Sequence, residues 1–179
     1  VLLQIKSYLE KENKHFLLAC YILHYLFVRP HEMTFLKIKD ISREKKTLTL
    51  NGSYTKNGHD AIVTIPNHVI ALMEELDIFS APPDFYLFRK KFRPGMTPIP
   101  ADRFSRFWVD NVKKTLGLSD FYKFYSLKDT GITNMIKAKT DLLSVRDQAR
   151  HSSVKITNIY TPQDCKEANR NLIGYEGVF

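Results

Sequence analysis

The sequence is poor in cysteine and has no long uncharged apolar run. Its 179 residues include two cysteines, Cys20 and Cys165, and their positions match neither a disulfide framework nor a set of metal ligands. No apolar run approaches the ~20 residues that a membrane-spanning helix needs, and no stretch has the pattern of a signal peptide. Cys20 lies within an apolar stretch, as a buried thiol would. These absences argue against a disulfide-rich secreted protein and a membrane protein, and they favour a reducing cytoplasm.

Two further absences concern cofactors and metals. The sequence has no glycine-rich phosphate loop, so a nucleotide cofactor is not expected. Asp40 and Glu44 lie in a hydrophilic loop and form no acidic cluster of the kind that two-metal nucleases use. Five histidines lack metal-ligand spacing to cysteine or carboxylate residues: His15, His24, His31, His59 and His68. These patterns argue against a nucleotide-binding loop, a histidine metal site and a two-metal nuclease.

What the sequence does have is an excess of positive charge, +8 over the whole chain. Nearly all of it falls between residues 89 and 128, where ten Lys and Arg residues face three Asp residues. Such a segment indicates a partner that carries many phosphates, with simple solubility as the alternative. Aromatic residues are interleaved, and Phe104, Phe107 and Trp108 recur at helical spacing, which favours a place in the core. The residues predicted to contact a nucleic acid are Arg89, Lys90, Lys91, Arg93, Arg103, Arg106 and Lys123.

Apolar periodicity predicts a mainly helical fold with one small antiparallel sheet. Two β-rich runs, Thr47–Leu50 and Ala61–Ile65, flank a turn that contains Gly52 and Asn57-Gly58. This arrangement predicts a hairpin or a three-stranded sheet. Helices are predicted over residues 1–11, 14–27, 31–36, 67–76, 102–116, 126–138, 141–149 and 153–160.

Residues at the ends of these elements add detail. Asn67 and Asp102 are predicted to cap the helices that they begin, and Gly117 is predicted to end the second of these helices. Phe85–Phe88 lies in a proline-rich loop and is predicted to form a short strand or an apolar plug.

Three short motifs carry the functional argument. Arg29 follows an apolar helix, and its guanidinium can bind two oxygens of one phosphate while Glu32 holds it in place; a surface ion pair is the alternative. Lys56 lies in the predicted turn, where it can enter a groove and give a proton to a leaving oxygen, unless it is an ordinary solvated lysine. His151 lies nine residues before Tyr160, and a Ser-Ser helix start separates them.

An arginine, a mid-chain lysine and then His…Tyr, in this order, resembles the catalytic domain of the tyrosine recombinases, the phage integrase family. The resemblance covers roughly residues 16–162, and Ala149–Tyr160 is its most specific part. It implies the family's fold. It also implies that Tyr160 attacks a DNA phosphodiester to form a 3′-phosphotyrosyl link, which a free 5′-hydroxyl later reverses. The implied catalytic residues, acting without metal or cofactor, are Arg29, Lys56, Lys128, His151 and Tyr160.

The chain departs from the family pattern His-x-x-Arg, where it has Tyr125 and Lys128. Lysine keeps a positive charge but lacks the two-pronged guanidinium. Tyrosine donates a hydrogen bond but is no base at neutral pH, and Tyr125 is equally well interpreted as a packed aromatic residue. Arg150 stands where the family's Leu-Gly-His motif has glycine, and we hypothesise that it offsets the loss at Lys128. Tyr125, Arg150 and Glu32 are therefore accessory candidates.

For the wider organisation, the resemblance implies a catalytic domain over residues 1–162 and a tail over residues 163–179. It also implies a tetramer on paired sites of double-stranded DNA. The apolar residues of the tail make it a candidate for exchange between protomers, or for packing on its own domain. Because the chain starts at Val1 inside a predicted helix, we expect it to be a piece of a longer protein, without the family's N-terminal core-binding domain.

Three hypotheses of function remain open at this point. The first is a site-specific recombinase, the integrase of a bacterial mobile element. The second is a DNA-binding relative whose chemistry has weakened at Tyr125 and Lys128. The third is type IB topoisomerase-like strand passage, which uses a similar set of residues to relax supercoils. The short spacing from the Ser-Ser pair to Tyr160 favours a recombinase over a topoisomerase.

Overall fold

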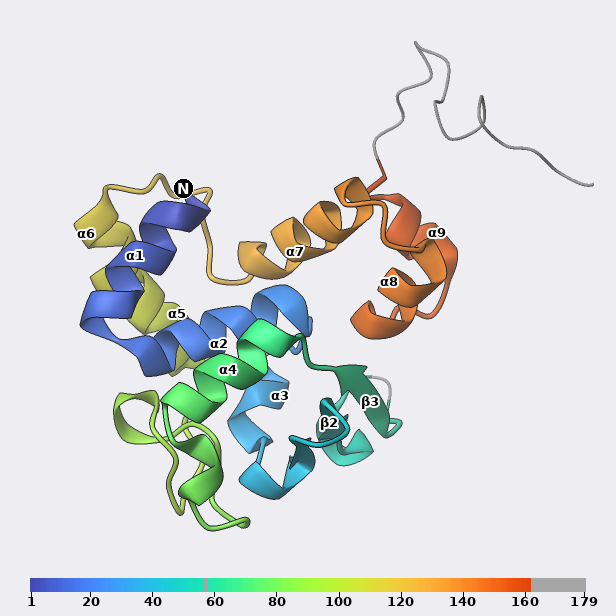
Figure 1. Cartoon of the computed structure of the whole chain (residues 1–179). Coiled ribbons are helices and arrows are strands. Elements are labelled where there is room, and N and C mark those ends of the chain that lie inside the picture. Colours follow the sequence, from blue (N-terminus) through green and yellow to red (C-terminus); the bar gives the residue numbers. More distant parts are fainter. Residues whose placement is uncertain (57, 162–179) are drawn as a thin grey trace, which may run out of the picture.

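A computed structural model describes residues 1–56 and 58–161 and shows a helical protein with one small sheet (Figure 1). Strands β1 (Ile41–Ser42), β2 (Thr47–Leu50) and β3 (Ala61–Thr64) form an antiparallel sheet in the order β1-β2-β3. The predicted mainly helical fold with a small antiparallel sheet is confirmed. The α-helices are α1 (Leu2–Glu12), α2 (Lys14–Tyr25), α3 (Pro30–Phe35), α4 (Asn67–Glu75), α5 (Asp102–Phe107), α6 (Lys114–Leu116), α7 (Ser126–Lys137), α8 (Leu142–Ala149) and α9 (Val154–Asn158). Single 3-10 turns lie at Ile38–Asp40, Gly52–Tyr54, Ile78–Ser80 and Lys90–Phe92.

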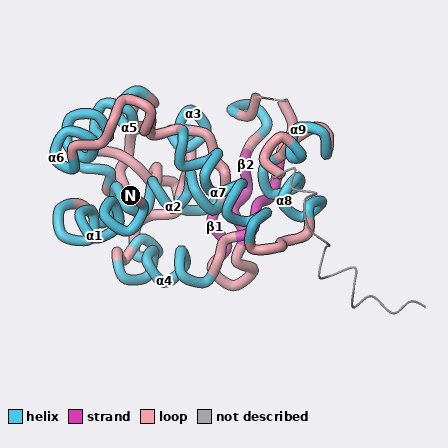
Figure 2. Tube along the Cα trace, turned by 90° about the horizontal axis from the view of Figure 1, so that it is seen from above, coloured by secondary structure: helices cyan, strands magenta, loops and turns pink. Residues whose placement is uncertain are grey.

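Helix α2 runs through the main hydrophobic core, and Figure 2 shows it in the middle of the helices, with the strands to one side. The helix begins where the Asn13 side chain accepts a hydrogen bond from the Phe16 amide, at 2.9 Å. Phe16, Ile22 and Leu23 have no exposed surface, and helices α1, α4 and α7 pack against α2. The ring of Phe16 contacts three other rings: Phe92, Phe107 and Phe124.

Helices α2 and α7 approach each other closely at Gly131, which is buried. A Cβ atom at this position would lie 1.9 Å from the carbonyl oxygen of His24 and 2.9 Å from the ring of Phe27. Only glycine permits this approach, because any larger residue would push the two helices apart. The approach brings the start of α7, with Lys128, next to the end of α2.

The predicted hairpin is present, with Leu48 of β2 opposite Val63 of β3. The Asp60 carboxylate closes the connection between these strands by accepting a hydrogen bond from the Gly52 amide, at 2.6 Å. A side chain at Gly52 would collide with the backbone on the other side of the turn, because its Cβ would lie 2.7 Å from the Gly58 carbonyl oxygen. The turn is therefore compact, and it carries Lys56 exposed to solvent.

A second, smaller cluster of buried apolar residues lies apart from the main core and consists of Phe27, Ile132, Val145 and Ala149. Gln148 adds polar links between α8 and its neighbours. Its amide nitrogen donates to the carbonyl oxygens of Thr64 (2.8 Å) and Tyr25 (3.2 Å), and its oxygen accepts from the Thr64 amide (2.9 Å). Hydrogen bonds therefore make up much of the attachment of α8 to β3 and α2.

Two predicted helix caps are wrong. Asn67 is the first residue of α4 and makes no cap; its side chain accepts a hydrogen bond from Lys46 Nζ instead, at 2.7 Å. Asp102 is likewise the first residue of α5, and it pairs with Arg106 one turn further on, at 2.7 Å. In both places a nearby basic side chain takes the oxygen that would otherwise cap the helix.

The predicted helix over residues 102–116 is interrupted by a π-helical segment, Trp108–Lys113. Its end at Gly117 is as predicted, with φ at +61°, a left-handed conformation that glycine adopts without strain. Phe104 and Trp108 are buried and Phe107 is partly buried, so the predicted core position of these aromatic residues is confirmed.

Phe85–Phe88 forms a plug and not a strand. Tyr86 makes single β-bridges to Lys37 and Gly95, while Leu87 and Phe88 are fully buried. Cys20 is a buried thiol, as predicted, whereas Cys165 lies outside the described residues. Within residues 1–56 and 58–161, no helix has the length and apolar character to cross a membrane.

Candidate active site

A small pocket of about 230 Å³ lies between the β2–β3 turn, the start of α3 and the turn between α8 and α9. It brings together four residues predicted from the sequence, which come from three segments of the chain that span more than a hundred positions. Its lining includes Arg29, Lys56, Arg150 and His151, together with Thr55, His59, Asp60, Ala61 and Ser152. Lys128 and Tyr160 lie nearby but do not line it.

Arg29 occupies the position before α3, and Pro30 begins that helix. Glu32 accepts hydrogen bonds from both the Arg29 backbone amide (2.8 Å) and its guanidinium (3.1 Å). The Glu32 side chain is only 2% exposed and that of Arg29 is 23% exposed. This pair is therefore not the solvated surface ion pair of the alternative interpretation.

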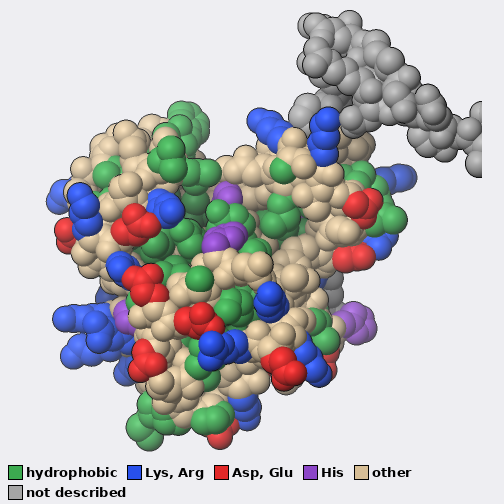
Figure 3. Space-filling view, viewed as in Figure 1, with side chains coloured by type: hydrophobic (Ala, Val, Ile, Leu, Met, Phe, Trp, Pro, Cys, Tyr) green, Lys and Arg blue, Asp and Glu red, His purple; other side chains and the backbone are tan. Residues whose placement is uncertain are grey.

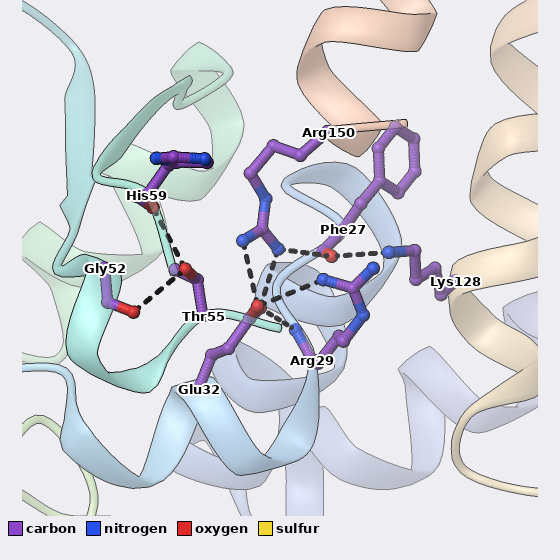
Figure 4. A network of polar contacts seen from close by, with 8 residues as sticks. All are labelled: Phe27, Arg29, Glu32, Gly52, Thr55, His59, Lys128 and Arg150. Carbon is purple, nitrogen blue, oxygen red and sulfur yellow. Dashed lines mark hydrogen bonds and ion pairs between the residues drawn. The ribbon is translucent and has the colours of Figure 1, made fainter. Parts of the chain in front are cut away.

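Arg150, which lies 118 positions after Glu32 in the sequence, binds the same carboxylate. Its guanidinium contacts both oxygens of Glu32, at 2.9 and 2.6 Å, and lies 3.4 Å from the carbonyl oxygen of Phe27 (Figure 4). Burial alone would raise the pKa of Glu32, but the hydrogen bonds and charges of Arg150 and Arg29 lower it below its ordinary value. Among the described residues, the buried Nε of Arg150 has no hydrogen-bond partner.

The backbone explains why the resemblance implies glycine at this point of the chain. Arg150 follows the last residue of α8 and has φ at +55°, in the left-handed region. Glycine adopts this conformation freely, whereas for a residue with a side chain it costs about 1–2 kcal/mol. Here an arginine takes on that strain and delivers a guanidinium to Glu32.

Lys128, in the first turn of α7, is 2% exposed and donates a hydrogen bond to the carbonyl oxygen of Phe27, at 3.0 Å. Burial, followed by the charges of Arg29 and Arg150, lowers the pKa of Lys128 to about 7. Phe27 has φ at +57°, and its carbonyl accepts from both basic side chains. Figure 4 shows Lys128 and Arg150 on opposite sides of this oxygen.

His151 and Tyr160 lie side by side, with ring centroids 6.2 Å apart and planes inclined by 15°. Nδ1 of His151 lies 2.9 Å from the hydroxyl of Thr157. Burial, with the charges of Lys128, Arg29 and Arg150, lowers the pKa of His151. Tyr160 follows α9, which ends two residues earlier at Asn158, so the predicted helix through residue 160 is slightly too long.

The Tyr160 hydroxyl donates a hydrogen bond to Asp129, with 2.9 Å between the oxygens. Burial, and then this bond and the charge of Asp129, raise the pKa of Tyr160 to about 12. Asp129 was not among the site residues predicted from the sequence. The available signal was its position directly after Lys128, within the motif that departs from the family pattern.

Other predicted residues do not line the pocket. Tyr125 is 42% exposed at the start of α7, so it is not the packed aromatic residue of the alternative interpretation, and it lies close enough to Tyr160 to affect its pKa. The basic residues predicted to contact DNA are all exposed, and none of them lines the pocket: Arg89, Lys90, Lys91, Arg93, Arg103, Arg106 and Lys123.

A larger hollow of the described surface lies elsewhere, between α1, α2, α4 and α7. Its volume is about 840 Å³ and its lining is mostly apolar, with His24 and His68 among the polar residues. Figure 3 shows hydrophobic and histidine side chains within this hollowed face. The described residues contain no group of three His, Cys, Asp or Glu that could hold a metal ion.

The arrangement of helices beside a small antiparallel sheet is that of a tyrosine-recombinase catalytic domain, as solved structures show. The XerA recombinase aligns with a TM-score of 0.71 at 22% identity, over 90% of this chain and 58% of that one. The Tn1549 transposon integrase, solved in complex with a circular intermediate DNA, aligns with a TM-score of 0.67 at 17% identity, over 86% of this chain and 55% of that one. The integrase from mycobacterium phage Brujita aligns with a TM-score of 0.62 at 19% identity, over 83% of this chain and 47% of that one.

The family itself follows from the sequence match. Residues 2–167 match the model of the phage integrase family, so the chain belongs to that family. No curated protein matches the chain. The chain spans a little over half the length of the first two solved relatives.

Proposed function

We propose that this chain is the catalytic part of a site-specific recombinase, the integrase of a mobile element, which cleaves and rejoins double-stranded DNA through Tyr160. The observation that carries this proposal is the convergence of Arg29 and Arg150 on the single carboxylate of Glu32, beside His151 and the pocket. One buried carboxylate does not neutralise the two guanidinium groups of Arg29 and Arg150. The remaining positive charge suits a bound phosphate.

In this proposal Arg29 and Arg150 hold the non-bridging oxygens of the scissile phosphate. A guanidinium binds two oxygens of one phosphate at once, and Glu32 orients both guanidinium groups. His151 adds a third donor to the developing negative charge. Such donors in a water-poor site are each worth about 2.7–4 kcal/mol in the transition state.

The proposed reaction conserves the number of phosphate esters. The Tyr160 oxygen bonds to phosphorus while the bond from phosphorus to the 5′-oxygen breaks, which leaves a 3′-phosphotyrosyl link and a 5′-hydroxyl. Lys56, exposed at the rim of the pocket, gives a proton to the departing 5′-oxygen. The reverse reaction with a second 5′-hydroxyl rejoins a strand, so no metal or cofactor has a role in this scheme.

The exposed basic residues supply the proposed grip on the rest of the duplex. The Tn1549 integrase, a structural relative, was solved in complex with DNA. Phosphate neutralisation makes such binding steeply dependent on salt. An affinity for DNA that barely changes between low and high salt would contradict this part of the proposal.

The test is covalent capture on nicked duplex DNA, in which the short cleaved fragment diffuses away and traps the intermediate. A pool of duplexes with randomised sequence serves as the probe, because the target site is unknown. The expected result is a protein–DNA adduct that survives SDS, is lost in Tyr160→Phe and persists in Tyr122→Phe. Tyr122 is a matched control because it is exposed and lies outside the pocket.

The two alternatives correspond to different outcomes of this test. Specific binding without any adduct would support a DNA-binding relative with weakened chemistry, which the engagement of Lys128 with the Phe27 carbonyl favours. An adduct accompanied by relaxation of supercoiled plasmid, without exchange between two sites, would support type IB topoisomerase-like strand passage.

Arg150 has a test of its own. Arg150→Gly removes the guanidinium while keeping a residue that adopts the left-handed backbone, so backbone strain does not confuse the result. We expect cleavage to fall by about 10²-fold or more, with Arg150→Lys in between. Unchanged cleavage in Arg150→Gly would remove Arg150 from the proposed site.

Assembly is a separate part of the proposal. We propose that four copies act on two DNA sites and that the segment 163–179, which lies outside the described residues, passes from one copy to the next. The apolar hollow between α1 and α7 offers a surface for its Leu172, Ile173 and Phe179. Removal of residues 163–179 should abolish higher-order complexes on DNA and leave cleavage of a single site; an unchanged oligomeric state would contradict the exchange.

A further inference from the structure

Asp129 is the one side chain that hydrogen-bonds to the proposed attacking atom among the described residues, and the reaction scheme above leaves it without a role. Its Oδ1 lies 2.9 Å from the Tyr160 hydroxyl oxygen. The residue sits in the first turn of α7, and its own carbonyl accepts a hydrogen bond from the Thr133 hydroxyl, at 2.9 Å. The position of Asp129 is therefore set by a regular helix and not by a free loop.

We propose that Asp129 is a catalytic residue that takes the proton of the Tyr160 hydroxyl during cleavage and returns it during religation. This inference rests on the proposed function, in which Tyr160 is the nucleophile. It assigns a base to the attacking atom, the Tyr160 oxygen, whereas Lys56 acts as the acid for the leaving 5′-oxygen.

The first argument for Asp129 is that the tyrosine proton must leave during the attack. Burial and the contact with Asp129 raise the pKa of Tyr160 to about 12, so its phenolate is not formed in advance near neutral pH. A phenol that stays protonated attacks phosphorus only if a base accepts its proton as the new bond forms. A carboxylate already in hydrogen-bond contact meets that need.

The second argument is that the nearest other base is poorly arranged for this task. His151 is the titratable ring beside Tyr160, but its Nδ1 is engaged by Thr157. Its ring lies nearly parallel to the phenol ring, with centroids 6.2 Å apart, and no hydrogen bond joins the two side chains in the described structure. His151 is better placed to donate to the phosphate than to accept from Tyr160.

The proposed step balances. In cleavage, the bond from the Tyr160 oxygen to phosphorus forms and the bond from phosphorus to the 5′-oxygen breaks. The phenol proton passes to Asp129, and the 5′-oxygen receives a proton from Lys56. In religation, the 5′-hydroxyl returns its proton to Lys56, and Asp129 protonates the departing phenolate.

Single-turnover cleavage by the full chain tests the proposal, on a nicked duplex selected from the randomised pool by covalent capture. Asp129→Asn keeps the size and the hydrogen-bonding oxygen of the side chain but cannot accept a proton. We expect adduct formation to slow by roughly 10²-fold, with unchanged affinity for the duplex. Asp110→Asn, an exposed aspartate far from the pocket in sequence, serves as the control and should cleave at the unaltered rate.

A sulfur substitution separates the two sides of the reaction. When sulfur replaces the 5′-bridging oxygen, the leaving thiolate needs no proton, so Lys56→Ala should regain its rate on this duplex. Asp129→Asn should stay slow on both duplexes because its defect lies on the attacking side. Regained cleavage by Asp129→Asn on the sulfur duplex would overturn the assignment.

Chemical rescue distinguishes a base from a residue that only positions Tyr160. Asp129→Ala leaves a space beside the hydroxyl, and added formate should restore part of the cleavage rate. An equal or faster rate in Asp129→Asn would overturn the proposal and make Asp129 a residue that restrains Tyr160. No adduct from the unaltered chain would overturn both the function and this inference, whereas an adduct lost in Tyr160→Phe but undiminished in Asp129→Asn would overturn the inference alone.

Discussion

Around α2, the side chains that lie away from solvent are almost all apolar, and Phe16, Ile22 and Leu23 have no exposed surface. Around the candidate site, Glu32 and Lys128 are buried nearly as deeply, at 3% and 2% exposure. The apolar cluster there has only four fully buried members. One region is held by packing, and the other is held largely by charges and hydrogen bonds.

The two regions differ in what they contribute, because one stabilises the fold and the other positions the side chains of the site. Burial of apolar surface contributes about 25 cal/mol per Å² and does not depend on any ligand. Buried ion pairs contribute little net stability, because removal of the charges from water offsets their attraction. We infer that the α2 core stabilises the fold, while the network around Glu32 sets the geometry of the site and is most stable when an anion completes it.

Phe16→Ala tests the contribution of apolar packing in the core around α2. The ring contacts three other rings, so its loss should leave a cavity and lower the free energy of unfolding by about 4 kcal/mol. Urea denaturation followed by circular dichroism measures this change. Phe121→Ala, at a site 91% exposed, should have almost no effect, and equal effects of the two changes would contradict the assignment of the core.

Glu32→Gln tests the network of charges and hydrogen bonds around the candidate site. It leaves two guanidinium groups and Lys128 without their carboxylate, which should cost about 3 kcal/mol. Added sulfate should recover part of the loss, because an anion can replace the missing charge; thermal melting with and without sulfate measures this recovery. Glu74→Gln, whose partner Arg43 is exposed, should change stability by less than about 1 kcal/mol. A loss in Glu32→Gln that sulfate does not touch would show that the network is not an anion site.

The buried Lys128 should make the stability of the folded chain depend on pH. Its pKa is about 7 in the folded chain against 10.5 as the ordinary value. Between these values the unfolded chain binds the proton and the folded chain does not, so this group makes stability rise with pH across that window. Lys128→Met should therefore be more stable than the unaltered chain below pH 7, by about 2 kcal/mol, and the difference should shrink toward pH 10. Urea titrations at several pH values test this, and a difference independent of pH would contradict the lowered pKa.

Gln148→Ala should produce the smallest change. It removes three hydrogen bonds that join α8 to Thr64 and Tyr25. Because these bonds are largely exposed to water, we expect a loss of about 1.5 kcal/mol, the low end for three such bonds. The effect should be local, with faster hydrogen exchange in α8 and α9 and unchanged exchange in α2. Gln4→Ala, at an exposed position of α1, is the control and should leave hydrogen exchange unchanged in α8, α9 and α2. Faster exchange in α2 as well would mean that the two regions unfold together.

Much of the fold could be predicted because its signals are local. The apolar stripe of α2, the two β-rich runs and Gly117 each report on a few neighbouring residues, and the elements that they predict are present. The caps at Asn67 and Asp102 were wrong because Lys46 and Arg106 take their side-chain oxygens. The first of these partners lies 21 positions away in the sequence, where no local pattern indicates it.

Contacts between residues far apart in the sequence also limited the prediction of the site. Arg29, Lys56, Arg150 and His151 were predicted through a family resemblance, and the fold brings them to one pocket. The contact of Asp129 with Tyr160 and the burial of Lys128 against the Phe27 carbonyl depend on how α7 crosses α2. That crossing is set by packing at Gly131, which sequence periodicity alone does not reveal.

The left-handed backbone at Arg150 also bears on how such a site could arise. In the genetic code, a single-base change converts a glycine codon into an arginine codon. Such a change at position 150 adds a guanidinium beside Glu32 and backbone strain of about 1–2 kcal/mol in the same step. The added charge is therefore gained only where the rest of the fold tolerates that strain.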